Sequence, residues 1–294
     1  MPDTAVFERH RSHLLNIAYR MLGEMAAAED VVQEAWLRWR RAGDEGIRDP
    51  KAWLSAATVR LSLDALRSAR ARREIYVGPW LPEPILPDDT RALAADGPAA
   101  RAELASDLSL ALLMVLERLS PEERAALILH DAFDSDYADI AAVLGKTEAA
   151  CRKLVSRARD RVKAERPRHT ATQDQHRALL ERFLAAAATQ DPAALVPLLK
   201  DDVILYSDGG GIVAAALNPI YGADKVARFT TGVIRKFGVG ANFSAAPTEL
   251  NGAPGFILRN GIELHSALTV EVDGDQISAI YLVRNPEKLR RIVV

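Results

Sequence analysis

The sequence has a single cysteine, Cys151, and lacks an apolar run long enough to span a bilayer. One cysteine cannot form an intramolecular disulfide and suits a reducing compartment. A membrane-spanning helix needs about 20 consecutive apolar residues. The charged residues 8–11 interrupt the first apolar stretch early, so a secretory leader is not expected either. These absences favour a cytoplasmic protein.

Residue patterns that bind metals or phosphates are also scarce. The six histidines never fall at ligand spacing supported by cysteines. No glycine-rich loop precedes a lysine-bearing helix, as phosphate binding in nucleotide hydrolases requires. We therefore expect no metal and no cofactor, and we expect that the protein is not an enzyme.

The net charge is only −2, but basic residues gather in two segments. Residues 51–73 contain six basic residues and one acidic residue, and residues 146–168 contain nine basic and three acidic ones. Two basic segments in a near-neutral chain are candidate binding sites for a polyanion such as DNA. Ordinary solvated helix faces have the same composition, so charge alone leaves both interpretations open.

Helical spacing of apolar residues dominates the first half of the chain. It predicts helices over 26–41 and 51–74, with Pro50 at the start of the second, and a further apolar helix over 125–133. Between the second and third of these helices, residues 78–89 contain four prolines within nine positions. Such a segment forbids helix and favours an extended, stiff tether between domains.

A helix-turn-helix is predicted further along. Ser120-Pro121-Glu122-Glu123 has a capping serine, a proline at the first helical position and acids in the first turn. A short helix over 137–144, closed by Gly145, then leads into a basic helix over 148–162. This order is typical of helix-turn-helix domains. Cys151 is expected to face the core of this motif as a small apolar side chain.

Strand patterns occur only in the last third of the chain. The hairpin signal Asp273-Gly274-Asp275 joins two alternating apolar segments. Helices are expected over 173–188, from 191 onward and over 222–237, and strands over 203–207, 256–259, 265–272 and 277–283. Helices followed by an antiparallel meander predict a separate α+β domain.

Two stretches of the chain resemble the conserved regions 2 and 4 of bacterial sigma factors. The stretches that resemble region 2 are Ala28–Leu37, Trp53-Leu54, Asp64 with Arg67, and Arg70–Arg73. The stretches that resemble region 4 are Leu119–Arg124 and Tyr137–Ala141 with the turn that follows. Together, in this order, they imply a DNA-binding subunit of RNA polymerase. They cover about 140 residues of the chain.

The linker and the last domain narrow the resemblance to extracytoplasmic-function sigma factors with a fused SnoaL-like domain. The implied multidomain fold has a region 2 helical bundle at 1–76, a proline-rich linker at 77–100 and a region 4 helix-turn-helix at 101–167. An α+β domain built as an NTF2-like cone of curved sheet and helices follows at 168–294. In this group the last domain is thought to replace a separate anti-sigma partner and to act on the sigma domains in cis.

The resemblance assigns roles to residues of region 2. Binding to the β′ clamp of core RNA polymerase would fall to four positions of one helix, Asp30, Gln33, Glu34 and Trp36. Recognition and melting of the promoter −10 element would fall to the loop 44–50 with Arg60, Arg67 and Arg70. One alternative is that Asp30 and Glu34 only form exposed charge pairs with Arg38 within the helix. Trp36 could likewise be a core residue, and Asp64 could have a purely structural role.

Region 4 would bind the β flap of the polymerase and read the promoter −35 element. A helix in the major groove reaches base edges with short polar or forked cationic side chains near its N-terminal end. The helix after Gly145 offers such side chains at five positions, Glu148, Arg152, Lys153, Ser156 and Arg157. Glu148 suits cytosine, and Arg152 or Arg157 suits guanine.

Three short motifs carry the resemblance to the fused-domain group, and we interpret them as one regulatory contact surface between the linker and the last domain. The residues are Trp80, Pro82, Glu83, Pro84, Asp208, Gly209, Gly210, Gly211, Asn285, Pro286 and Leu289. The three motifs lie at residues 80–84, 208–211 and 285–289. The glycines of the second motif can adopt positive φ and allow a partner to approach the backbone closely. The chain departs from the group's pattern at Glu287, usually aspartate, and at Ile212, usually lysine. The alternatives are a mobile loop at the glycines and a Trp80 ring packed on its nearest domain.

Three rival functions remain open. The last domain could be a cyclase or isomerase with a buried base, for which Asp208, Glu263 and His265 are candidates and Tyr206 a possible donor. It could instead bind an apolar small molecule and shift the domain arrangement. The helix-turn-helix could also belong to a regulator that binds operator DNA without polymerase.

Overall fold

The computed structural model describes residues 4–42, 47–73, 76–93, 108–165, 171–237 and 243–292. The chain divides into two compact units. The first contains residues 1–75, 88–108 and 112–166, and the second contains 76–87, 109–111 and 167–294. The proline-rich segment 76–87 therefore belongs to the same unit as the last third of the chain.

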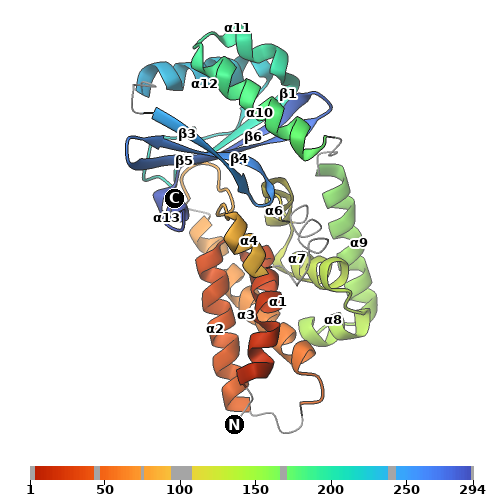
Figure 1. Cartoon of the computed structure of the whole chain (residues 1–294). Helices are drawn as coiled ribbons and strands as arrows, with labels where there is room; N and C mark the ends of the chain where they lie inside the picture. The colour runs from red at the N-terminus through yellow and green to blue at the C-terminus, as the bar shows by residue number, and fades with distance from the viewer. Residues whose placement is uncertain are drawn as a thin grey trace. The chain divides into compact units, whose positions relative to one another are not determined.

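Three long helices form the N-terminal part of the first unit. They are α1 (Thr4–Leu22), α2 (Met25–Ala42) and α3 (Pro50–Arg73), which pack on one another in all three pairs (Figure 1). Leu14, Ile17, Leu54 and Trp39 are almost fully buried between them. Proline begins α3 as predicted, because its fixed φ suits the first helical position. A short helix, α4 (Pro87–Leu93), follows the extended segment.

The helix-turn-helix of the first unit forms as predicted. Its helices are α7 (Pro121–Leu127), α8 (Tyr137–Leu144) and α9 (Glu148–Glu165), preceded by α6 (Leu110–Glu117). Ser120 and Glu123 form a reciprocal capping box at the start of α7. Gly145 ends α8 in the left-handed conformation, with φ of 64°. Cys151 is fully buried.

The predicted helix over 125–133 forms, but most of its second half is π-helical rather than α-helical. The chain changes there from α7 into a π-helical turn, Ile128–Ala132, in which each bond spans one more residue. Asp134 ends the turn with φ of 49°, and the backbone amide of Ser135 bonds back to the carbonyl of Leu129. Apolar spacing does not distinguish the two kinds of turn, since Ile128 and Leu129 are buried in either.

One six-stranded sheet organises the second unit. The strands are β1 (Leu199–Asp208), β2 (Ile220–Tyr221), β3 (Phe243–Leu250), β4 (Ala253–Asn260), β5 (Glu263–Asp273) and β6 (Gln276–Val283). Their order is β2-β1-β6-β5-β4-β3, and every pair is antiparallel except β1 with β6. Register shifts within β1, β4 and β5 mark bulges, which bend a sheet.

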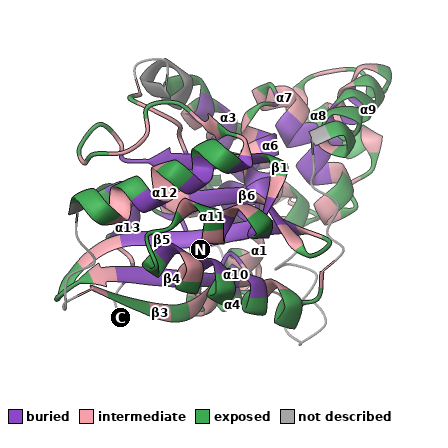
Figure 2. Ribbon diagram, turned by 90° about the horizontal axis from the view of Figure 1, so that it is seen from above, coloured by how far each residue is buried: buried purple, intermediate pink, exposed green. Residues whose placement is uncertain are grey.

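Helices α10 (Gln173–Ala188), α11 (Pro192–Leu195) and α12 (Ala223–Phe237) lie together on one face of this sheet (Figure 1). A 3-10 turn, Val196–Leu198, leads into β1, and α13 (Pro286–Leu289) follows β6. The central parts of β5 and β6 are buried, whereas α12 exposes its outer side (Figure 2). The α+β prediction is confirmed, including the β5–β6 hairpin, but β2, β3 and α13 were not predicted.

None of the helices in the described ranges is both long and apolar enough to cross a membrane.

Candidate functional site

The N-terminal half of α9 presents the five predicted base-reading side chains together. Cys151, Val155 and Ala158 are buried against the rest of the helix-turn-helix. The opposite surface of the helix carries the exposed residues Glu148, Arg152, Lys153, Ser156 and Arg157. This is the arrangement that a recognition helix needs, because its core side holds the helix while the polar side remains available to a groove.

Two of these side chains are engaged with each other. Arg152 Nη2 lies 2.8 Å from Glu148 Oε2, and its guanidinium lies 5.0 Å from the centre of the Tyr137 ring. Exposed pairs of this kind contribute little to stability. Both side chains can therefore change partners at small cost when a base edge is offered.

The four positions predicted to bind core RNA polymerase lie on α2 and are exposed or half-buried, and we call them the α2 strip. Asp30 and Gln33 are exposed, and Glu34 is half-buried and pairs with Arg38 at 3.3 Å. Trp36 is half-buried and packs on Phe7, with ring centres 4.8 Å apart. The strip thus combines acidic groups with the edge of an aromatic ring.

The residues assigned to the −10 element differ in their surroundings. Arg60 donates hydrogen bonds to the carbonyl oxygens of Ala142 (2.9 Å) and Val143 (3.1 Å) at the end of α8. Arg67 pairs with Asp64 at 3.2 Å, so Asp64 bonds within its own helix. The Arg70 side chain and loop residues 43–46 lie outside the described residues.

A buried arginine makes a second contact within the first unit. Arg124, in α7, donates to the carbonyl oxygen of Met21 and to Glu117 Oε1, both at 2.6 Å. Its burial lowers the pKa of the guanidinium to about 9, so that it is still protonated at neutral pH. Arg60 and Arg124 together connect the helices that resemble region 2 to those that resemble region 4.

The proline-rich segment has neither helix nor strand over residues 76–86, but it is not a solvated tether. The prediction that residues 78–89 exclude helix is wrong at the end of this stretch, because α4 begins at Pro87, where proline suits the first helical position. Residues 81–85 are all buried, and Leu81 and Ile85 are fully inaccessible. The backbone of Ile85 bonds Asn251 twice: its carbonyl accepts from the Asn251 amide at 2.9 Å, and its own amide donates to Asn251 Oδ1 at 3.2 Å. Asn251 occupies the β3–β4 turn with φ of 53°. The segment therefore packs as an additional strand-like element of the second unit.

A buried ion pair holds this segment at its other end. The fully buried Asp208 carboxylate, at the end of β1, accepts from four donors: the Tyr76 hydroxyl (2.6 Å), Leu81 N (2.9 Å), Gly210 N (3.0 Å) and Lys288 Nζ (2.7 Å). Four is the number that a carboxylate can accept. The charge is thus fully compensated inside the protein.

Lys288, in α13, completes the same cluster. Its ammonium also donates to the carbonyl oxygen of Leu81 at 2.5 Å and lies 4.1 Å from the centre of the Trp80 ring. Asn285 donates to the Tyr76 hydroxyl at 2.9 Å. Trp80 therefore contacts a residue 208 positions away in sequence. We call Tyr76, Leu81, Asp208, Asn285 and Lys288 the linker clamp.

Gly210 and Gly211 let the loop after β1 pack closely against Asn285 and Val77. A Cβ on Gly210 would lie 2.6 Å from Asn285 Cγ, and one on Gly211 would lie 3.1 Å from Val77 Cβ. Both glycines have positive φ, of 64° and 73°. The loop is therefore fitted to the clamp and to the linker. Ile212, at the position where lysine is usual, is more than half exposed.

Gly210→Ala is expected to destabilise the second unit more than Gly261→Ala does. Gly261 has a similar φ of 60°, but a Cβ at this position would have nothing within 4 Å, so its substitution costs only the backbone strain of about 1–2 kcal/mol. Gly210→Ala adds the clash with Asn285. Denaturant unfolding of the two variants measures the difference, and equal losses would show that the clamp does not constrain the loop.

The rival catalytic residues do not converge. Asp208 is bound in the clamp, Glu263 is exposed at the start of β5, and Tyr206 stacks on Tyr281 with ring centres 5.7 Å apart. His265 alone of the four lines a cavity, which lies between the helices and the sheet. A general base and a donor are thus not brought together.

Comparison with known proteins identifies the family. Residues 6–72 match the family model for Sigma-70 region 2, and residues 109–162 match that for Sigma-70, region 4. The chain is 39% identical to the ECF RNA polymerase sigma factor SigJ of Mycobacterium tuberculosis over 294 aligned residues. The alignment covers 97% of this chain and 93% of SigJ. The chain belongs to the ECF sigma factors.

Other comparisons agree with this family. The sigma factor is 32% identical to the probable ECF RNA polymerase sigma factor SigI of Mycobacterium tuberculosis, covering 98% of this chain and 95% of that one. The crystal structure of Mycobacterium tuberculosis SigJ matches with a TM-score of 0.77 at 36% identity, over 98% of both chains. This sigma factor accordingly directs transcription initiation, as its sequence predicted.

Sequence reasoning missed three members of the linker contact: Tyr76, Asn251 and Lys288. Lys288 lies inside the motif at residues 285–289, but lysine is rarely fully buried and was given no role there. The signal that could have found it is the buried Asp208, which requires a cation wherever it is removed from water.

Proposed function

We propose that the α2 strip binds core RNA polymerase and that α3 and α9 bind the −10 and −35 elements of promoter DNA in the cytoplasm. The exposure of Asp30, Gln33 and the five α9 residues supports these roles. The acidic strip suits a basic partner, and the cationic face of α9 suits DNA.

We further propose that the C-terminal domain regulates the sigma domains in cis by holding the linker. The observation that carries this proposal is the buried Asp208–Lys288 pair. Asp208 accepts from the backbone amide of Leu81, and Lys288 donates to the backbone carbonyl of the same residue. Removing one partner of such a pair strongly destabilises the fold, because it leaves the other charge buried without compensation. The linker is thus held by a discrete contact that is either formed or broken.

The held state is inhibitory in this account. Arg60 and Arg124 join the region 2 and region 4 helices directly. The −10 and −35 positions differ by about 25 base pairs, roughly 85 Å along B-form DNA at about 3.4 Å per base pair. Modules in contact with each other cannot occupy both elements at once. We propose that release of the linker accompanies their separation.

Asp30→Arg is expected to weaken the binding of core RNA polymerase by roughly tenfold or more, because it places a cation where the partner surface is expected to be basic. Glu181→Arg, an equal charge change on the exposed side of α10, is the control and is expected to bind normally. Fluorescence anisotropy of labelled full-length protein with purified core enzyme measures both.

Equal affinities for the two variants would remove the α2 strip from the polymerase interface. Binding of duplex promoter by the free protein, with no affinity for core enzyme, would instead favour the rival regulator that acts without polymerase.

A further inference from the structure

A cavity of about 420 Å³ lies within the C-terminal domain, between α10, α12 and the sheet. Its walls are largely apolar. Side chains from both helices and from five strands line it, among them Phe183, Leu184, Phe229, Leu258, Leu268 and Leu282. Its volume is that of a site for a small organic ligand.

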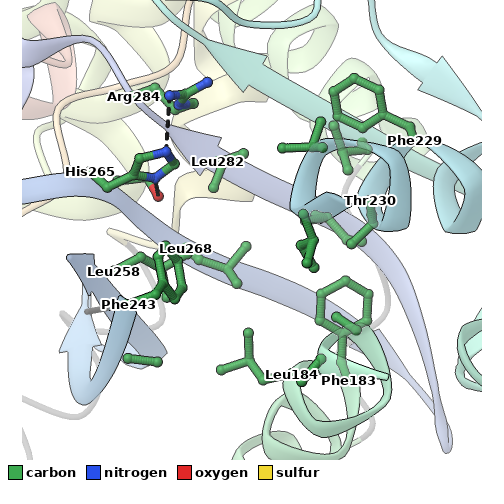
Figure 3. A pocket seen from close by; sticks show the side chains of 18 of the residues that line it. Phe183, Leu184, Phe229, Thr230, Phe243, Leu258, His265, Leu268, Leu282 and Arg284 are labelled. Carbon is green, nitrogen blue, oxygen red and sulfur yellow. Dashed lines mark hydrogen bonds between the residues drawn. The ribbon is translucent and has the colours of Figure 1, made fainter. Parts of the chain in front are cut away.

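The lining includes the polar residues Thr230 and Asn260, but its arginine and its histidine lie together at one side. Figure 3 shows Arg284 and His265 bonded to each other there, with the apolar side chains of Phe183 and Leu184 on the other side. Arg284 Nη2 lies 3.0 Å from His265 Nε2, and His265 Nδ1 lies 3.1 Å from Ser266 Oγ. The cavity therefore has an apolar body and a hydrogen-bonding head.

We propose that this cavity binds an amphipathic organic anion, a carboxylate with an apolar chain or ring, whose carboxylate is held by Arg284. The guanidinium presents a planar fork of donors that matches a carboxylate. The apolar walls receive the chain, and its burial contributes in proportion to the area removed from water.

The charge of the polar side supports an anion over a neutral ligand. Burial lowers the pKa of His265, and the charge of Arg284 lowers it further, so the imidazole is neutral near pH 7. Burial also lowers the pKa of Arg284, but an arginine remains protonated at this pH. None of the described residues that line the cavity is acidic, so no lining carboxylate would repel a bound anion.

The position of Arg284 connects this site to the linker clamp. Its backbone amide donates to the carbonyl oxygen of Asp208 at 2.7 Å, and its guanidinium also bonds the carbonyl of Ala214, in the loop that follows the glycines. A ligand that pulls on Arg284 therefore acts on the same loop that contacts Val77 of the linker.

The test is calorimetric titration of the full-length protein with decanoate and with 1-decanol, below their aggregation concentrations. Wild type is expected to bind decanoate at least tenfold more tightly than 1-decanol. Arg284→Met is expected to lose this preference while it still binds 1-decanol, which also shows that its cavity is folded. Arg290→Met, which changes an exposed cation outside the cavity, is the control and is expected to retain the preference.

Absence of decanoate binding to wild type would overturn the proposal, and so would an undiminished preference in Arg284→Met. Arg284→Lys, which keeps the charge but not the fork, is expected to give an intermediate preference. The titrations contain neither polymerase nor DNA, so their failure would leave the proposed role in transcription untouched.

Discussion

Lys288→Met lowers the free energy of unfolding of the C-terminal domain by about 3–5 kcal/mol in our expectation, because it leaves the buried Asp208 carboxylate without its cation. Methionine retains the length and apolar stem of lysine, so the loss comes from charge rather than from volume. The segment 76–87 loses the bond to the Leu81 carbonyl at the same time. Denaturant unfolding and limited proteolysis of this segment measure the two effects.

Lys200→Met is the matched control for this substitution. Lys200 also pairs with an aspartate, Asp273, but the pair is about one-third exposed. The unfolding midpoint and the proteolysis pattern of Lys200→Met are expected to match those of wild type, since partly exposed ion pairs contribute little to stability. Asp208→Asn combined with Lys288→Met removes both charges and is expected to be more stable than Lys288→Met alone. An additive loss in the double variant would contradict a coupled ion pair.

Arg152→Ala combined with Arg157→Ala is expected to weaken recognition of the cognate promoter. Each bidentate pair with a base that is removed costs about 1–3 kcal/mol, or roughly 5- to 150-fold in affinity. Both side chains are exposed on α9, so the fold does not depend on them. Run-off transcription with reconstituted holoenzyme, on cognate and −35-substituted promoters, measures the loss and its dependence on sequence.

Arg182→Ala controls for the change in net charge, since Arg182 is an exposed cation on α10, in the C-terminal domain. It is expected to leave promoter selectivity unchanged. Unaltered transcription from the cognate promoter by the α9 double variant would remove these arginines from the reading surface.

Local signals were sufficient to predict much of the fold. Ser120 with Pro121 marked a helix start, and Gly145 marked a helix end, because capping and left-handed backbone depend only on neighbouring residues. The turn at 273–275 marked the last hairpin for the same reason. The exposed face of α9 followed from helical periodicity around Cys151.

Interactions between residues far apart in the sequence could not be predicted from such local signals. The pairing of Lys288 with Asp208 joins two motifs 80 positions apart, and it depends on the parallel placement of β1 beside β6. Pro82 and Pro84 correctly excluded helix from their part of the chain, but their presence also suggested a tether between domains. Burial of that backbone depends on Asn251 and on the glycine loop, whose shape only the assembled sheet determines.

Run-off transcription by the full-length Asp208→Asn, Lys288→Met double variant shows whether the C-terminal domain restrains transcription by holding the linker. The double variant is preferable to truncation, because removal of the domain would expose Leu81 and Ile85 to water. With core enzyme bound equally, we predict faster proteolysis of residues 76–87 and a higher transcript yield than wild type. If the linker is released but the transcript yield is unchanged or lower, the C-terminal domain does not restrain transcription by holding the linker.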